Sequence, residues 1–332
     1  MTRQLLLAAA LAAAAPLTAQ SLAARVAHAP DGVVHLTYAA RDGVCGNGAG
    51  TISFDCADGT CGHRRITTNS DWDDDTPCPC ETGPVRLALE MTGGRVTRLR
   101  AYVGGHWKPA AAGVTDLGTV PATEAARFLL DQARTNQSRV GEEAIFPATL
   151  ADSVTVWPDL LKLARDANVS SRTRNQAVFW LSQAAGEAAV KDLADLVGDD
   201  TVDREVREHA VFALSESKEP EALNAVIRVA KEDKSPRVRG QALFWLAQRA
   251  GRKMAEGAIN DAITNDPETE VKKKAVFALT QMPGGDGVPL LIQVARTNRN
   301  PEVRKQAMFW LGQSKDQRAL AFIEEVLTGR RP

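Results

Sequence analysis

Five segments in the second half of the chain repeat one pattern of apolar and polar residues. In each, a valine or threonine is followed by an alanine four positions later and by a leucine eight positions later. Positions i, i+4 and i+8 lie on one face of an α-helix, so each segment is predicted to be an amphipathic helix. The predicted apolar faces consist of Thr173, Val206, Val238, Val271 and Val303, of Ala177, Ala210, Ala242, Ala275 and Ala307, and of Leu181, Leu214, Leu246, Leu279 and Leu311.

Each of these helices also carries a phenylalanine, and the five phenylalanines follow one another at an almost constant interval along the chain. A second apolar stripe follows each helix, as in Leu290, Leu291 and Val294, and predicts a second helix in every unit. A fixed period of this length is typical of a solenoid, in which each unit buries its apolar face against its neighbours. We therefore predict a mainly α protein in which residues 168–330 form five helix pairs of an α-solenoid.

The pattern V-R-x-x-A-x-x-x-L followed by a leucine-rich second helix resembles the HEAT repeats. Its short period is most similar to the bilin-lyase-type HEAT-like repeats. A basic residue follows the valine position in every unit, and a column of such residues could bind phosphate. Acidic neighbours such as Glu205, Glu208, Glu270 and Glu302 instead predict that these basic residues form ion pairs between repeats. The repeats contain one histidine, His209, and therefore lack the ligands that the HEAT-type iron hydroxylases need. The basic residues that follow the valine position are Arg174, Arg207, Arg239, Lys272 and Arg304.

The region before the repeats has a different pattern, in which short strands alternate with turns. Pro84–Met91 and Arg95–Val103 flank the turn Thr92-Gly93-Gly94, which predicts a hairpin. Val33–Ala40 and Thr51–Cys56 are also predicted strands. We expect residues 30–108 to form a small antiparallel β domain. Residues 109–122 are predicted to be a linker, and residues 123–167 an irregular N-terminal helical cap of the repeat stack.

All five cysteines lie in the predicted β domain. We predict the disulfides Cys45–Cys80 and Cys56–Cys61, with Cys78 left over. The alternative is a metal site formed by Cys56, Cys61, His63, Cys78 and Cys80. The C-x4-C and C-x-C spacings do not match the paired knuckles of zinc sites, so no metal or other cofactor is expected. The acidic run from Asp71 to Asp75 lacks the spacing of a helix-loop-helix calcium site and is predicted to be a solvated loop.

Residues 1–23 are typical of a signal peptide. Arg3 precedes an apolar run from Leu5 to Ala15, then Pro16 and small residues follow, so cleavage is expected between Ala19 and Ala24. This apolar run is too short to span a bilayer, and no membrane span is expected. We therefore expect a periplasmic or secreted protein. The net charge of −1 gives no field that would attract nucleic acid, which is not an expected partner.

The repeated phenylalanines are the main candidates for binding. They lie on a stripe with polar residues one turn away on either side, a combination of aromatic area and adaptable amides that suits a peptide-binding groove. The alternative is lateral packing between successive first helices, with amides bonded across the stack. The candidate partner-binding residues are Gln176, Phe179, Gln183, Phe212, Glu216, Gln241, Phe244, Gln248, Phe277, Gln281, Phe309 and Gln313.

Three tryptophans, Trp180, Trp245 and Trp310, occur in every second unit, and Ala213 and Ala278 occupy the equivalent positions of the intervening units. The unit therefore alternates between large and small at this position. One interpretation is an aromatic ladder that stacks on glycans. The other, which the helical wheel favours, is size complementarity between neighbouring units.

These patterns predict a non-enzymatic binding or scaffold protein whose solenoid engages an extended protein or peptide segment in the cell envelope. The first alternative is a cell-envelope glycan-binding protein that uses the tryptophans. A second alternative is an enzyme whose site lies between the β domain and the solenoid and draws on His106, Trp107 and the acidic loop. No P-loop, G-x-S-x-G or H-E-x-x-H motif is present.

Overall fold

The computed structural model describes residues 20–53, 56–57, 60–61, 65–67, 80–107, 113–183, 187–217, 219–250 and 252–329. It divides into two compact units. The sheet unit contains Met1–Gln132 and Ser138–Val154, and the array unit contains Ala133–Gln137 and Thr155–Pro332. No helix among the described residues is long and apolar enough to cross a membrane.

The sheet unit is built on a four-stranded sheet with the order β8-β7-β1-β9. The hairpin of β7 (Val85–Thr92) and β8 (Arg95–Val103) matches the predicted one, and β1 (Gly32–Tyr38) pairs antiparallel with β7. However, β9 (Val114–Thr119) pairs parallel with β1, so the sheet is mixed rather than antiparallel. The predicted linker at 109–122 is therefore wrong over β9, because the free edge of β1 binds this segment as a further strand.

One face of this sheet forms the core of the unit. Val34, Leu36, Leu87 and Leu89 are fully buried on it, whereas the residues between them along the strands are more exposed. The helices α2 (Ala122–Thr135), α3 (Arg139–Glu143) and α4 (Ile145–Thr149) lie wholly or mostly in the same unit. The buried Tyr38 hydroxyl donates to the carbonyl of Pro147 over 2.6 Å.

Because α2 to α4 complete the sheet unit, the prediction that residues 123–167 form a cap of the repeat stack is wrong for most of that range. The remaining helix, α5 (Trp157–Arg165), lies in the array unit and packs on α6. The apolar positions of α2 to α4 have a helical period without a repeat, and such a period alone does not identify the core that the helices cover.

The short helix α1 (Leu22–Ala27) is anchored in the sheet unit. Leu22 and Val26 are buried, and the backbone N–H of Leu22 donates to the Glu124 carboxylate over 2.6 Å. Most of the predicted signal peptide, residues 1–19, lies outside the described residues. Its last two predicted residues, Leu22 and Ala23, begin α1.

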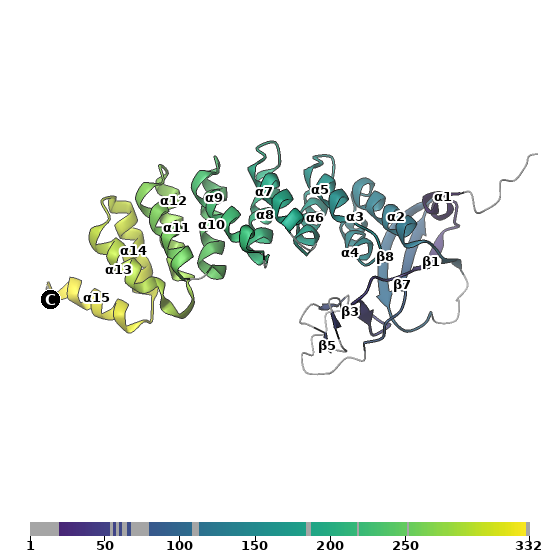
Figure 1. Ribbon diagram of the computed structural model, residues 1–332, viewed down its shortest axis with the longest axis horizontal. Helices are drawn as coiled ribbons and strands as arrows, with labels where there is room; N and C mark the ends of the chain where they lie inside the picture. Colours follow the sequence, from purple (N-terminus) through teal and green to yellow (C-terminus); the bar gives the residue numbers. More distant parts are fainter. Residues whose placement is uncertain are drawn as a thin grey trace, which may run out of the picture. The chain divides into compact units, whose positions relative to one another are not determined.

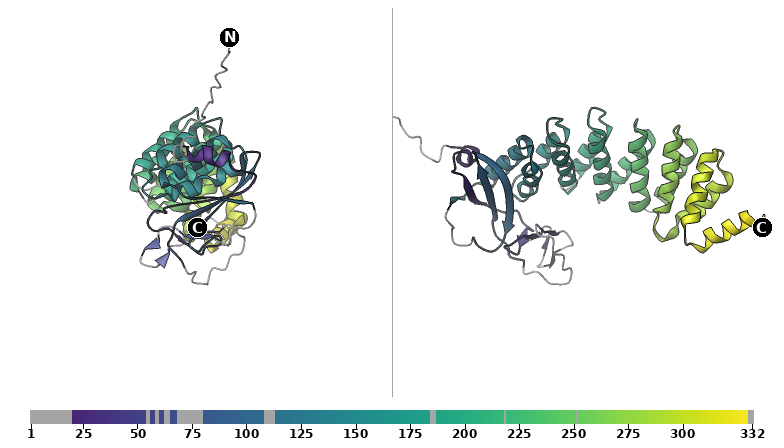
Figure 2. Two further views of the ribbon diagram at one scale, coloured as in Figure 1. Left: turned by 90° about the vertical axis from the view of Figure 1, so that its right-hand side faces the viewer. Right: turned by 180° about the vertical axis from the view of Figure 1, so that it is seen from behind.

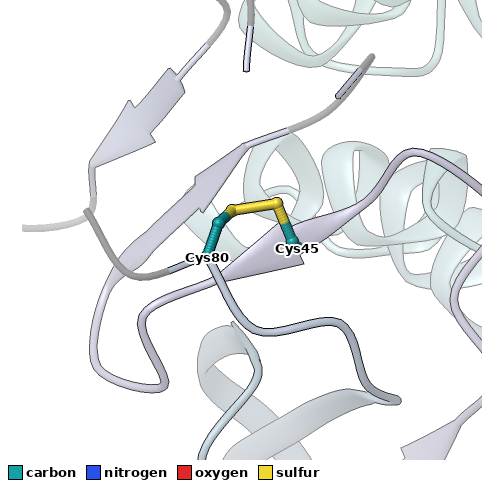
Figure 3. The surroundings of a disulfide bond; sticks show 2 residues. All are labelled: Cys45 and Cys80. Atoms are coloured by element: carbon teal, nitrogen blue, oxygen red, sulfur yellow. A yellow bond between two sulfur atoms is a disulfide. The ribbon is translucent and has the colours of Figure 1, made fainter. Parts of the chain in front are cut away.

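The described part of the sheet unit also contains small strands and the disulfide Cys45–Cys80. The strands β2 (Cys45–Gly46), β3 (Thr51–Ser53) and β6 (Arg65–Thr67) form a second sheet, and β4 (Cys56–Ala57) pairs with β5 (Thr60–Cys61). The predicted disulfide Cys45–Cys80 is present and joins residues 35 positions apart (Figure 3). The backbones of Cys56 and Cys61 lie opposite each other in register.

The side chains of Cys56, His63 and Cys61 lie outside the described residues, as do Cys78 and the acidic run from Asp71 to Asp75. A Cys56–Cys61 disulfide therefore stays a prediction. The proposed metal site is weakened, because its fifth member, Cys80, is bonded to Cys45.

The array unit consists of helices that follow one another in chain order, from teal to yellow in Figure 1. The five predicted helix pairs are present, and α5 precedes them. The pairs are α6 (Ser171–Gln183) with α7 (Glu187–Gly198), α8 (Arg204–Glu216) with α9 (Pro220–Glu232), α10 (Pro236–Arg249) with α11 (Arg252–Asn265), α12 (Thr269–Thr280) with α13 (Gly287–Thr297), and α14 (Pro301–Gln313) with α15 (Gln317–Thr328).

The predicted apolar positions of the first helices form the core of the array, and all fifteen are buried. The N-caps Ser235 and Asn300 precede helices that begin with proline. By contrast, α12 begins at Thr269, two residues after Pro267. The carboxylate of Asp266 accepts a hydrogen bond from the backbone N–H of Glu268 and also binds Arg239.

Candidate functional site

The predicted stripe of phenylalanines and polar residues lies on the first helices α6, α8, α10, α12 and α14, and we call it the phenylalanine face. Its two ends are the most open: the side chains of Phe179 and Phe309 are 42% and 53% exposed. Phe212, Phe244 and Phe277, between them, are half-buried. The face therefore combines two accessible rings with three that also support the packing of the helices.

The three central phenylalanines contact aromatic rings of neighbouring units. Phe212 packs on Trp245 with ring centroids 4.6 Å apart, and Phe277 packs on Trp310 at 5.0 Å. Between these two contacts, Phe244 and Phe277 stack nearly parallel, with centroids 6.0 Å apart. The alternative interpretation of lateral packing thus holds for the middle of the face, where Phe–Trp and Phe–Phe contacts alternate from one unit to the next.

The tryptophans are part of this packing. Trp180 is only 6% exposed, and Trp245 and Trp310 are half-buried. The Nε1 atoms of Trp245 and Trp310 are buried without a hydrogen-bond partner in the described structure. A glycan platform needs an open ring face and reachable polar atoms. The arrangement therefore does not favour the glycan-binding alternative.

The polar residues of the phenylalanine face bond in two ways. The amides of Gln183 and Gln281 donate to the hydroxyls of the preceding residues, Ser182 and Thr280, rather than to amides across the stack. Glu216 instead forms an ion pair with Arg249 of the next unit over 2.5 Å. At the two ends, Gln176 and Gln313 are exposed beside Phe179 and Phe309.

Three of the five basic residues, Arg174, Arg207 and Arg239, form a buried ladder between units rather than an open anion site, whereas Lys272 and Arg304 donate to the backbone carbonyls of Thr264 and Asn298. Arg207 binds Asp233 over 2.5 Å, and Arg239 makes two hydrogen bonds to Asp266, of 2.7 and 2.9 Å. The hydrogen bonds to Asp266 raise the pKa of Arg239. Arg174 pairs in the same way with Asp203.

Ion pairs between repeats were thus predicted correctly for these arginines, but their partners are aspartates just before the next first helix rather than the glutamates named from the sequence. A visible signal existed, since Asp233 and Asp266 each stand six positions before the basic residue of their own unit. A short side chain at that point reaches the buried guanidinium of the preceding unit.

Lys274 of α12 packs against the preceding unit. It lies over Gly240 of the preceding unit, where a Cβ atom would be 2.3 Å from the lysine Cδ. Burial lowers its pKa, and Arg237 lowers the pKa further, against the opposing effect of Glu208. Glu208 itself is bound to Arg237 over 2.8 Å.

A second cluster lies on the other face of the four-stranded sheet. The rings of His35 and Trp107 stack with centroids 3.7 Å apart, and the Arg86 guanidinium lies 4.8 Å from the Trp107 ring. Arg86 is buried and donates to the carbonyls of Gly48 and Gly104 over 2.9 and 2.6 Å. Trp107 therefore packs on a guanidinium that holds two loops, and His106, the other residue of the enzyme alternative, is exposed.

The second helices α7 and α9 border a depression of about 310 Å³ lined by Ala194, Gly198, Arg228, Asp233 and Lys234, among others. Several of its charged groups are already paired: Lys234 binds Asp200 over 2.5 Å, and Asp233 binds Arg207. Among the described residues, no group of three or more His, Cys, Asp or Glu side chains could hold a metal ion.

Comparison with known proteins identifies the helical part of the chain. Residues 157–247 and 258–331 match the family of HEAT repeats. Matching begins at α5, one helix earlier than the predicted start of the repeats at residue 168. The array unit is therefore a HEAT-repeat solenoid. No curated protein matches the chain.

A solved structure that matches is the complex of CpcE and CpcF of phycocyanin lyase from Nostoc sp. PCC7120. It has 20% sequence identity and a TM-score of 0.36, and the match covers 48% of this chain and 98% of that chain. The expectation that the protein is not an enzyme is contradicted, because a matching repeat structure belongs to a lyase. The likeness is too low to assign a reaction or a catalytic residue to this chain.

Proposed function

From its HEAT-repeat solenoid, we propose that the protein is a scaffold that binds an extended segment of a partner protein along the phenylalanine face. The observation that supports this most is the exposure of Phe179 and Phe309, each beside an exposed glutamine. Exposed aromatic rings flanked by adaptable amides are common anchors in protein interfaces.

The packing of the array supports the choice of the first-helix side. Each first helix packs extensively on the next one, α6 on α8, α8 on α10, α10 on α12 and α12 on α14, whereas second helices contact one another less. The first helices therefore form one continuous row along the array. Extended surfaces of this kind are used for binding by repeat proteins.

We also propose that the protein acts in the periplasm or outside the cell, with cleavage before Leu22. This location is consistent with the Cys45–Cys80 disulfide, since disulfides persist in oxidising compartments. Cleavage after Ala19 leaves α1 and its contact with Glu124 intact. Fractionation of cells and the mass of the mature N-terminus test this proposal. A cytoplasmic protein that keeps residues 1–19 would contradict it.

The binding proposal is tested with the two open phenylalanines, because substitution of the central ones would also damage the packing. Candidate envelope proteins are captured by the mature wild-type protein and by the double variant Phe179→Ala/Phe309→Ala. We expect the double variant to lose the partner while its thermal unfolding changes little. The matched control is Met254→Ala on α11, which removes a side chain of similar exposure, 41%, away from the face.

A photo-crosslinking residue at Gln313 then locates the contact directly. Crosslinks from Gln313 to the captured partner, and none from Met254, support the proposal. Equal capture by the wild type and the Phe179→Ala/Phe309→Ala variant would show that the partner binds elsewhere.

A further inference from the structure

Basic side chains from three successive first helices lie beside the phenylalanine face. They are Arg204 of α8, Arg237 of α10, and Lys273 and Lys274 of α12, and we call them the basic cluster. The three helices pack side by side, between teal and yellow-green in Figure 2. Each cation precedes the phenylalanine of its own helix by three, four, seven or eight positions. Such positions share one side of a helix, so the basic cluster flanks the phenylalanines towards the helix N-termini.

The array accommodates Lys274 through matched changes in two neighbouring units. At the position of this lysine the other first helices have Gln176, His209, Gln241 and Gln306. The lysine lies over Gly240 of α10, and the residues equivalent to that glycine are Asn175, Glu208, Lys273 and Lys305. A Cβ atom at Gly240 would be 2.3 Å from the lysine Cδ. The missing side chain on α10 therefore makes room for the aliphatic stem of Lys274.

Two carboxylates lie among these cations, and both are already paired. Glu208 binds Arg237 over 2.8 Å and lies 3.6 Å from Arg204. Glu270 binds Lys273 over 3.0 Å. The four cations of the basic cluster thus exceed the two carboxylates by two charges.

Lys274 is a cation without a pair, since it has no hydrogen-bond or ion-pair partner among the described residues. Glu205, a further acid of α8, instead accepts a hydrogen bond from Asn175 of α6. Burial lowers the pKa of Lys274, and the charge of Arg237 lowers this pKa further. Both effects disfavour the charged ammonium group, and a carboxylate in contact with it would oppose them. Complementary charge on a partner would therefore be an anion.

We propose that the partner segment is acidic and that Lys274 and Arg237 bind its carboxylates. This inference rests on the proposed function and adds the chemistry that the segment needs. The Arg237 side chain is 60% exposed and keeps donors beyond its contact with Glu208.

The spacing of the helices suits an extended segment. Neighbouring helices lie about 10 Å apart, so α8 to α12 span about 20 Å. About six residues of an extended chain cover this distance. Successive side chains of such a chain point to opposite sides. A segment that lies between the phenylalanines and the basic cluster therefore directs apolar side chains to the former and acidic side chains to the latter.

Two labelled twelve-residue peptides test the inference by fluorescence anisotropy with the mature full chain. One peptide alternates leucine with glutamate, and the other alternates leucine with glutamine. We expect the glutamate peptide to bind about 10-fold more tightly at low ionic strength, and this difference should shrink as salt is added.

Variants then locate the contact. Lys274→Gln/Arg237→Gln should weaken binding of the glutamate peptide about 10-fold and leave binding of the glutamine peptide unchanged. Lys274→Gln alone breaks no ion pair, and it should weaken the glutamate peptide about threefold with an unchanged circular dichroism spectrum. The matched control is Arg228→Gln/Lys253→Gln, which removes the same charges from exposed positions of α9 and α11 and should bind both peptides as the wild type does.

Equal affinity for the two peptides, or no binding of the glutamate peptide, overturns the inference. An equal loss in the Arg228→Gln/Lys253→Gln control overturns it too, because net charge alone would then explain the binding. The variant Phe179→Ala/Phe309→Ala separates the inference from the proposed function. If it loses both peptides while Lys274→Gln/Arg237→Gln binds the glutamate peptide normally, the phenylalanine face is the anchor and the inference is wrong. If it binds both peptides normally while Lys274→Gln/Arg237→Gln does not, the basic cluster binds acidic segments and the proposed anchors fail.

Discussion

The two units of the molecule differ in how far apart along the chain their contacting residues are. In the sheet unit, Tyr38 donates a hydrogen bond to Pro147, 109 positions later, and Val34 lies opposite Leu89. In the array unit, α8 packs on α6, α7, α9 and α10, which are its nearest neighbours in the chain. The sheet unit must therefore fold as a whole, whereas the stability of the array is close to a sum over neighbouring pairs of repeats.

The largest expected effects come from removing a buried leucine in each unit. Leu246→Ala and Leu89→Ala should each lower the free energy of unfolding by about 2–5 kcal/mol, because each leaves a cavity in a packed core. The two substitutions should destabilise regions of different extent. Hydrogen exchange should speed up mainly in α8 to α12 for Leu246→Ala, and throughout the sheet for Leu89→Ala.

Faster hydrogen exchange over the whole array in Leu246→Ala would contradict the expectation that the effect of this substitution stays local. The control is Leu320→Ala on α15, which removes an exposed leucine of the same array and should change exchange only near its own helix.

Loss of the disulfide should affect the unfolding of the sheet unit and leave that of the array unit unchanged. Cys45→Ala should lower the stability of the sheet unit by about 2–4 kcal/mol, since the bond closes a loop in the unfolded chain. The repeats contain no cysteine, so a reducing agent should leave the unfolding of the array unchanged. Calorimetry with and without reductant measures both transitions. A reductant that shifts the transition of the array would mean that the units are not independent.

A finer test concerns the tryptophans of the array. Trp245→Ala should cost about 3 kcal/mol, because Phe212 and Phe244 both pack on its ring. Trp245→Phe should cost less than about 1.5 kcal/mol, because the ring contacts are largely kept and the Nε1 donor has no partner to lose. Denaturant unfolding measures both variants. Equal losses for Ala and Phe would show that the Nε1 group, rather than the ring, makes the contribution.

The smallest expected effect is a pH dependence of the stability of the sheet unit. Burial lowers the pKa of His35 below its ordinary value of 6.5, an effect that Asp116 opposes and Arg86 reinforces. The unfolded chain therefore binds a proton more readily than the folded one, and stability falls as the pH drops from 6.5 through the lowered pKa. His35→Gln should reduce this slope, as measured by urea unfolding between neutral and mildly acidic pH. An unchanged slope would exclude His35 as its source.

The sequence predicted the array better than the sheet unit, for a physical reason. Five copies of one apolar pattern specify helices that contact their neighbours, so the period alone identifies the fold. The strand β9 was missed because its edge position leaves most of its side chains partly exposed, and its partner β1 lies far away in the chain. The pattern of β9 alone therefore carries little information about pairing.

The sequence predicted which residues share the phenylalanine face but not how exposed they are. Phe277 and Phe309 occupy equivalent positions, yet Phe277 is covered by Trp310 of the next unit and Phe309 is open. Exposure depends on what the next unit supplies, which is a property of pairs of units. The aspartates of the arginine ladder were missed for a related reason, since Asp266 serves both the start of its own unit and Arg239 of the unit before.

The alternation of Phe–Trp and Phe–Phe contacts determines how many units can be added to or removed from such an array without disturbing its packing. Trp180, Trp245 and Trp310 recur in every second unit, so two units form the true module. Deletion of one unit would bring two like interfaces together, whereas deletion of two would restore the alternation. Gene duplication or protein engineering that preserves the stack should therefore add or remove helix pairs two at a time.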